Sequence, residues 1–168
     1  MRPALVLDQK IACSVFKTGG LWCSLAGMTT RSEILYASEP ALDTAEFRRV
    51  LVESGLGETR PVNDDARLQT MLANANLVLT ARLDIEGKPL IGVLRAVTDF
   101  SWVCYISELA VSQSAQGLGI GKGLMDEARR QLGPSVAISL ISMPDAVGFY
   151  ERIGMKHMAD AFWFGRKG

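Results

Sequence analysis

From residue 34 onward, segments in which apolar residues have helical spacing alternate with segments rich in branched and aromatic residues. Helical spacing of the apolar residues predicts helices over 42–56, 64–75 and 116–132, and a short helix over 146–152. Polar residues that can cap a helix stand at the first two starts: Asp43 or Thr44, and Asp64 with Asp65. Four helices are therefore expected.

Segments rich in branched and aromatic residues predict the strands. These segments are 34–37, 77–83, 90–97, 102–111, 136–141 and 158–164, the last being a strand or hairpin. The turn residues 86–89 join two of them and predict a hairpin. The order of elements predicts a mixed α/β domain, in which an antiparallel meander leads into a βαβ unit.

The first 30 residues do not fit this pattern. They hold two short apolar stretches that charged residues interrupt, which disfavours a secretory signal. Met28 precedes a polar run that leads into the first predicted strand, so it offers an alternative start. We expect an N-terminal extension over 1–30, either a strand-like appendage or a non-native upstream sequence, and then one domain over 31–168.

Composition excludes several classes of protein. The 168 residues include 18 basic and 18 acidic side chains, so the formal net charge is zero, which disfavours a general nucleic-acid binder. The apolar runs fall short of the roughly 18 residues of a membrane span. Hydrophobic residues make up 48% of the chain, as in an ordinary globular domain. We expect a cytoplasmic protein that binds neither nucleic acid nor membrane.

Cysteine and histidine are too few for a structural metal site. Cys13, Cys23 and Cys104 are far apart and form no CxxC pair, and His157 is the single histidine. We therefore expect no metal and free thiols, as in a reducing cytoplasm. Four aromatic residues are expected in the core or an interface: Trp102, Phe162, Trp163 and Phe164.

Glycines cluster between the strand of 102–111 and the helix that follows. They stand at positions 117, 119, 121 and 123. A loop with little side-chain bulk lets backbone N–H groups converge at the positive end of a helix, where phosphate binds. The alternative is a helix start whose small residues allow close packing. The loop matches neither of two known phosphate-binding motifs. Gln116 stands where a Walker A loop requires glycine, and Lys122 stands where the dinucleotide-binding fingerprint requires it.

A third phosphate-binding pattern fits the same loop. Residues 116–121, Gln-Gly-Leu-Gly-Ile-Gly, match Q/R-x-x-G-x-G/A and resemble the acetyl-CoA loop of the GNAT superfamily of acyl-CoA N-acyltransferases. Residues 108–111 are similar to that family's fourth strand. Residues 145–155 resemble its A-x-x-F-Y-x-x-x-G-F/M segment after the fifth strand. The three elements occur in the family's order, and the resemblance covers residues 34–166.

The resemblance implies a GNAT-type fold and a mode of cofactor binding. The fold has a central mixed, mostly antiparallel sheet that is splayed between its fourth and fifth strands and flanked by helices. Acetyl-CoA, the acyl-donor cosubstrate, would lie in the gap. The implied binding residues are Leu109, Ala110 and Val111 for pantetheine, and Gln116, Gly117, Leu118, Gly119, Ile120, Gly121 and Lys122 for pyrophosphate. Met143 departs from the family, because many members carry Asn there.

The resemblance also implies the reaction, an N-acetyl transfer from acetyl-CoA to a primary amine by direct attack. Tyr150 matches a tyrosine that family members place near the CoA sulfur, where it acts as general acid; the alternative is a core aromatic. Glu108 can serve as general base, or it can be a surface or salt-bridged residue, with Ser107 or a water chain in its place. The alternative function is a non-catalytic acyl-CoA-binding regulatory module.

The acceptor is expected to be a small-molecule or peptide amine. Its pocket is expected near residues 56–65 and 159–164. The first of these segments mixes acidic and basic residues, so it shows no plain charge preference. A homodimer is possible, because such assemblies are common in the family.

Overall fold

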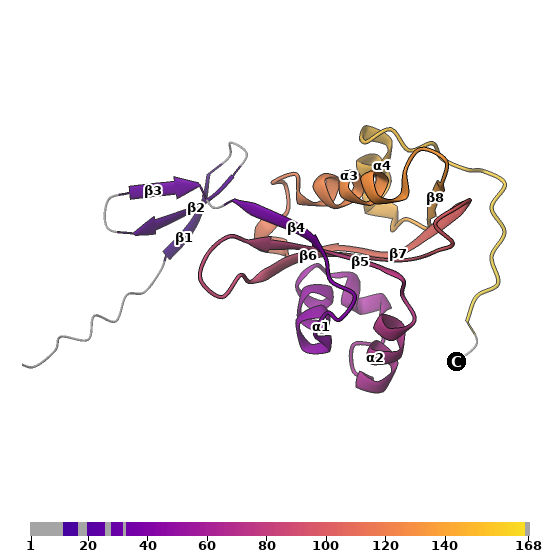
Figure 1. The fold of residues 1–168 in the computed structure, drawn as a ribbon, viewed down its shortest axis with the longest axis horizontal. Helices are drawn as coiled ribbons and strands as arrows, with labels where there is room; N and C mark the ends of the chain where they lie inside the picture. Colours follow the sequence, from indigo (N-terminus) through magenta and orange to yellow (C-terminus); the bar gives the residue numbers. More distant parts are fainter. Residues whose placement is uncertain (1–11, 17–19, 26–27, 32, 167–168) are drawn as a thin grey trace, which may run out of the picture.

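The computed structural model describes residues 12–16, 20–25, 28–31 and 33–166, which form two separate sheets (Figure 1). The smaller sheet is antiparallel and lies within the N-terminal stretch. Its strands are β1 (Ala12–Phe16), β2 (Gly20–Leu25) and β3 (Met28–Arg31). The division into an extension and a domain at residue 31 remains a prediction.

The larger sheet has five strands in sequential order. They are β4 (Ile34–Ser38), β5 (Leu77–Leu83), β6 (Leu90–Thr98), β7 (Val103–Val111) and β8 (Ala137–Leu140). Neighbouring strands are antiparallel from β4 to β7, and β8 is parallel to β7. This confirms the predicted mixed α/β class, with a meander that leads into a βαβ unit.

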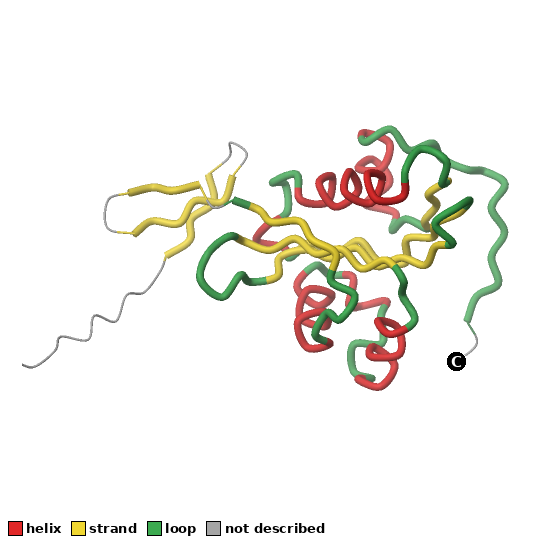
Figure 2. Tube along the Cα trace, in the orientation of Figure 1, coloured by secondary structure: helices red, strands yellow, loops and turns green. Residues whose placement is uncertain are grey.

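Helices cover both faces of this sheet (Figures 1 and 2). One face carries α1 (Thr44–Glu53) and α2 (Asp65–Ala73), and the other carries α3 (Ile120–Leu132) and α4 (Val147–Arg152). Three short 3₁₀ turns join the elements: η1 (Leu56–Thr59), η2 (Gln113–Ala115) and η3 (Pro144–Ala146). The four predicted helices are confirmed.

The predicted caps of the first two helices are confirmed. Asp43 accepts a hydrogen bond from the backbone N–H of Glu46 at 3.0 Å, and Asp64 accepts one from that of Arg67 at 2.9 Å. Each carboxylate satisfies an N–H of the first turn that has no partner within the helix. Two apolar cores form on the two faces of the sheet, one against α1 and α2 and the other against α3.

The predicted strand over 158–164 is wrong. The segment after α4 forms no strand, and in Figure 1 it runs past the end of the sheet without joining an edge. Its aromatic residues are exposed, with Phe162 at 97%, and so is Trp102, so these residues lie outside the core and their place in an interface stays a prediction. Local composition favours an extended backbone, but a strand also needs a neighbouring edge to pair with.

We expect Arg82→Met to destabilise the domain. The Arg82 guanidinium on β5 bonds Glu39 at 2.8 Å and Glu46 at 2.7 Å, tying β5 to the segment before α1 and to α1. These bonds lower the pKa of both carboxyls from an ordinary 4.5. The stabilisation is therefore present above pH 4.5 and is lost as the pH falls below it. The network is partly exposed, so we expect a loss of about 1–3 kcal/mol.

Thermal melts at pH 7 and at acid pH test this expectation. The difference in melting temperature between the natural protein and Arg82→Met should shrink as the carboxyls are protonated. Arg130→Met is the matched control, because it removes the same group from an exposed pair with Glu127 on α3. A control that melts as low as Arg82→Met would contradict the proposed importance of the network.

Candidate active site

Strands β7 and β8 separate halfway along β7. Val103 to Ile106 pair with Ala137 to Leu140, and β8 then ends. Residues 108–111 of β7 pair with β6 on one side, and no described strand pairs with the other edge of residues 107–111. This edge therefore has no strand partner, and the carbonyls of Ser107 and Val111 accept from the side chains of Arg60 and Gln116 instead. This is the splay between the fourth and fifth strands of the domain that the resemblance implied.

A β-bulge lies where the two strands part. Arg95 pairs with Glu108 and the next residue, Ala96, pairs with Ile106, so Ser107 is the extra residue of the bulge. Because of this extra residue, side chains before and after the bulge that would share one face of a regular strand lie on opposite faces of the sheet. Ile106 packs in the core beside α3, whereas Ala110 packs in the core beside α1 and α2. The bulge thereby directs Glu108 to the face of α1 and α2.

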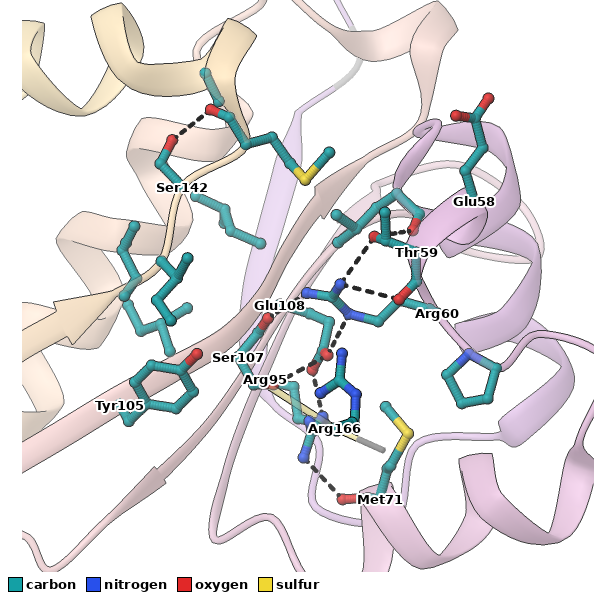
Figure 3. A pocket seen from close by; sticks show the side chains of 18 of the residues that line it. Glu58, Thr59, Arg60, Met71, Arg95, Tyr105, Ser107, Glu108, Ser142 and Arg166 are labelled. Atoms are coloured by element: carbon teal, nitrogen blue, oxygen red, sulfur yellow. Dashed lines mark hydrogen bonds and ion pairs between the residues drawn. The ribbon is translucent and has the colours of Figure 1, made fainter. Parts of the chain in front are cut away.

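A cavity of about 700 Å³ opens at the bulge (Figure 3). Its walls come from η1, α2, the middle of β7, the segment after β8, α4 and the C-terminal segment. The polar and charged residues that line it are Glu58, Thr59, Arg60, Arg67, Arg95, Tyr105, Ser107, Glu108, Ser142, Tyr150 and Arg166. Met143, the departure from the family pattern, lines it as well. The cavity is large enough for a small-molecule site.

Glu108 is held between two arginines at the floor of this cavity. One carboxylate oxygen lies 2.7 Å from Arg60 Nε, and the other lies 2.5 Å from Arg95 Nε. The Ser107 hydroxyl donates to the first oxygen at 3.0 Å. The carboxylate is 1% exposed, and Figure 3 shows both guanidinium groups turned toward it. Of the alternatives for Glu108, the structure contains the salt-bridged one.

Tyr150 reaches the same cavity from α4. Its ring stands edge-on to Phe149, with 5.0 Å between centroids and 72° between planes. Phe149 in turn packs against the start of α3, since a Cβ at Gly121 would lie 3.3 Å from its Cζ. Burial raises the pKa of the Tyr150 phenol above its ordinary 10.0. The hydroxyl is therefore protonated at neutral pH and can donate a proton or a hydrogen bond.

The glycine-rich loop lies at the start of α3 and does not line the cavity. The first intrahelical bond runs from the N–H of Gly123 to the carbonyl of Gly119 at 2.9 Å. The N–H groups of residues 120–122 therefore belong to the first turn, which has no partners within the helix. The Gln116 side chain donates to the carbonyl of Val111 at 3.0 Å, which fixes the loop against the end of β7.

The glycines of the loop serve different purposes. Gly117 and Gly119 have φ of 79° and 82°, and a Cβ on either would meet nothing within 4 Å. They are needed for the backbone conformation and leave the loop open on its outer side. Gly123 fits the alternative of close packing, because a Cβ there would overlap the hydroxyl of Tyr36.

The structure brings some of the predicted site residues together and separates others. Glu108, Leu109 and Tyr150 line the cavity. The side chain of Ala110 is buried in the core beside α1 and α2, so only its backbone is available to a ligand. The Lys122 ammonium pairs with Asp126 on α3 at 2.5 Å.

Arg95 is the cavity residue that sequence reasoning missed, whereas Arg60 lies in the segment 56–65 that was expected near the acceptor pocket. Arg95 carries a detectable signal, because it interrupts the otherwise apolar run of β6 at a buried position. A buried arginine needs a carboxylate nearby. Nothing in the sequence points to the partner, because Arg60 and Glu108 come from distant segments.

In the described part of the chain, no helix has both the length and the apolar character needed to cross a membrane. The same residues contain no group of three or more histidine, cysteine, aspartate or glutamate side chains placed to hold a metal ion.

Residues 52–164 match the family model described as "Acetyltransferase (GNAT) domain". A stretch of 108 residues is 28% identical to an uncharacterized N-acetyltransferase, ycf52, of Pyropia yezoensis, over 60% of this chain and 62% of that protein. A stretch of 138 residues is 27% identical to serotonin N-acetyltransferase 2, chloroplastic, of Oryza sativa subsp. japonica, over 80% and 66%. The chain thus spans less than two thirds of the length of these curated relatives.

Solved structures show the same fold. A GNAT family acetyltransferase from Streptococcus pneumoniae TIGR4 has a TM-score of 0.64 at 21% identity, over 80% of this chain and 100% of that chain. The aminoglycoside N-acetyltransferase AAC(6')-Iy, in complex with CoA, has a TM-score of 0.62 at 14% identity, over 83% and 98%. At these identities the likeness concerns the fold alone.

Proposed function

Because this chain belongs to the GNAT acetyltransferase family, we propose that it transfers an acetyl group from acetyl-CoA to a primary amine by direct attack. The observation that carries the proposal is the open edge of β7 beside the unpartnered N–H groups at the start of α3. An extended pantetheine chain can pair with such an edge as an added strand does.

The loop residues fit the anionic part of the cosubstrate. Three N–H groups at the positive end of a 13-residue helix favour a pyrophosphate, and Gly117 and Gly119 leave the approach open. We assign the pyrophosphate to the backbone of residues 116–122 and the pantetheine to the backbone of residues 109–111. Acetyl-CoA supplies the activated acetyl group when it is bound.

We assign Tyr150 as the proton donor to the departing thiolate. It lines the same cavity as Leu109 of the open edge. Its raised pKa keeps the proton available at neutral pH. A thiolate in a partly dry cavity is a poor product unless a donor stabilises it.

The contacts of Glu108 favour a positioning role over that of general base. Both carboxylate oxygens already accept hydrogen bonds from guanidinium groups, and the Ser107 hydroxyl also donates to one of these oxygens. Both oxygens are thus engaged in strong charge-assisted bonds. We propose that Glu108 holds Arg60 and Arg95 at the cavity and that the amine loses its proton to solvent.

Glu108→Gln separates the two roles. A general base predicts a fall in kcat that recovers at high pH, where the amine is already neutral. The positioning role predicts a loss of kcat/KM for the acceptor at every pH. It also predicts a melting temperature lower by about 5 °C or more, because the buried Arg95 and the half-buried Arg60 lose their counter-charge. Recovery of kcat at high pH without destabilisation would restore Glu108 as the base.

The proposed activity is tested by release of free CoA thiol from acetyl-CoA with a panel of primary amines. The expected result is release that depends on one class of amine, together with an acceptor whose mass rises by one acetyl group. A regulatory module would instead bind acetyl-CoA and release no thiol with any amine. A cytoplasmic location, a possible homodimer and a domain over 31–168 complete the proposal.

A further inference from the structure

We propose that the acceptor is an amine that carries a carboxylate on the same small molecule, such as an α-amino acid. This inference rests on the proposed acetyl transfer and names its substrate class. It is carried by the charges around the cavity at the β7 bulge.

The ionic cluster at the floor of the cavity has one positive charge in excess. Arg60 and Arg95 share the single carboxylate of Glu108, and their side chains are 19% and 9% exposed. Buried charges are stable when they are paired, and a surplus charge in a low-dielectric site favours a counter-ion. A single surplus charge facing a cavity matches a monoanion.

Arg95 offers the free donor. Its Nε bonds Glu108 and its Nη1 bonds the carbonyl of Met71 at 3.1 Å. Among the described residues nothing accepts a hydrogen bond from its Nη2, and this atom is not enclosed by protein. Arg60, by contrast, uses all three nitrogens on Glu108, Thr59 and the carbonyl of Ser107. A carboxylate at Arg95 Nη2 would therefore complete the cluster without displacing an existing bond.

The rim of the cavity carries the same sign of charge. Arg67 and Arg166 line it, and neither forms an ion pair with another described residue. Glu58 is the acidic residue on the rim, and in Figure 3 its carboxylate points away from the cluster of Arg60 and Glu108. The lining thus holds four arginines and two glutamates. Such a cavity repels polycationic amines and attracts an amine that brings its own negative group.

Matched acceptors test the inference on the natural protein. Each α-amino acid of a panel is compared with its carboxamide, which keeps the amine and the side chain but lacks the charge. For the preferred side chain we expect kcat/KM to be at least about 30-fold higher for the acid, since a charge-assisted bond to a buried group is worth roughly 2 kcal/mol. The amide has the less basic amine, so intrinsic reactivity works against this result. Equal or better turnover of the amide would overturn the inference.

Amino-phosphonate analogues distinguish the two anions that arginine binds. Both carboxylate and phosphate fit a guanidinium group. The single surplus charge of the floor cluster formed by Arg60, Arg95 and Glu108 predicts that the carboxylate is the better substrate. A phosphonate preferred over its carboxylate would overturn the choice of a carboxylate.

Arg60→Gln tests the role of the cluster, because it leaves Glu108 and Arg95 as a neutral pair. We expect the acid-over-amide ratio to fall at least about tenfold, with the KM for acetyl-CoA changed less than about threefold. Arg60→Lys keeps the charge and should keep most of the ratio. Arg130→Gln is the matched control, since it removes an arginine from the outer surface of α3. An unchanged ratio in folded Arg60→Gln would remove the cluster from acceptor recognition.

Calorimetry separates failure of this inference from failure of the proposed function. If no amine releases CoA, the proposed activity fails, and binding of amino acids and their amides to the CoA-loaded protein is measured instead. Tighter binding of the acids would retain the anion site in the cavity. Equal or absent binding of both would overturn it.

Discussion

Replacing Gly119 by aspartate is expected to weaken acetyl-CoA binding at least about 100-fold, whereas asparagine should weaken it less than about tenfold. Both residues tolerate the left-handed conformation that the φ of 82° requires, and a Cβ there meets no atom within 4 Å. The two side chains have the same shape, so their difference isolates charge. A carboxylate about 5 Å from a pyrophosphate charge costs roughly 3 kcal/mol at an effective dielectric of 20.

Stability of the helix does not confound this comparison. Gly119 is the N-cap of α3, and Asp and Asn are both favoured caps. An aspartate would also accept from the same N–H groups that we assign to the pyrophosphate. Gly121 is a poorer choice, because any side chain there meets the ring of Phe149.

Gly133 provides the matched control at the other end of α3. It has a φ of 76° and equally open surroundings, and because its ψ of 176° strains aspartate and asparagine alike, the difference between the two still tests charge away from the loop. Isothermal calorimetry with acetyl-CoA should show no difference between Asp and Asn there. Equal affinity for Gly119→Asp and Gly119→Asn would contradict the assignment of the loop.

Tyr150→Phe is expected to lower kcat by about 10–10³-fold and to change the affinity for acetyl-CoA less than about threefold. The substitution removes one hydroxyl and keeps the ring that packs against Phe149. The expected loss is that of one proton donor in the step where the C–S bond breaks. Steady-state kinetics, with a melting curve to verify the fold, measure the effect.

The pH profile adds a second readout for Tyr150. Burial raises the phenol pKa above 10.0, so the donor stays protonated while the acceptor amine becomes neutral with rising pH. We expect kcat of the natural protein to rise through the mildly alkaline range and to fall only above pH 10, a fall that Tyr150→Phe should lack. Phe149→Leu is the comparison for packing, and it should lower the melting temperature more than Tyr150→Phe does. Full activity of Tyr150→Phe would return this residue to a purely structural role.

The sequence by itself determined the class of fold, the helices and their caps, and the family. These features depend on short-range patterns: apolar periodicity, aspartates at helix starts, and the spacing of residues 116–121. The glycine-rich loop is readable in the same way, because its conformation and its N–H groups come from one continuous segment. The segment over 158–164 shows the limit, since its composition favours a strand but no sheet edge receives it.

The tertiary structure alone decided what surrounds Glu108 and which charge the cavity carries. The bulge at Ser107 turns Glu108 toward α1 and α2, and a one-residue insertion in strand pairing leaves no mark in apolar periodicity. Arg60 lies directly after η1 and Arg95 lies on β6, and they are 48 and 13 residues away from Glu108 along the chain. Charges that look balanced along the sequence become unbalanced in space, because folding collects arginines from four segments around one cavity.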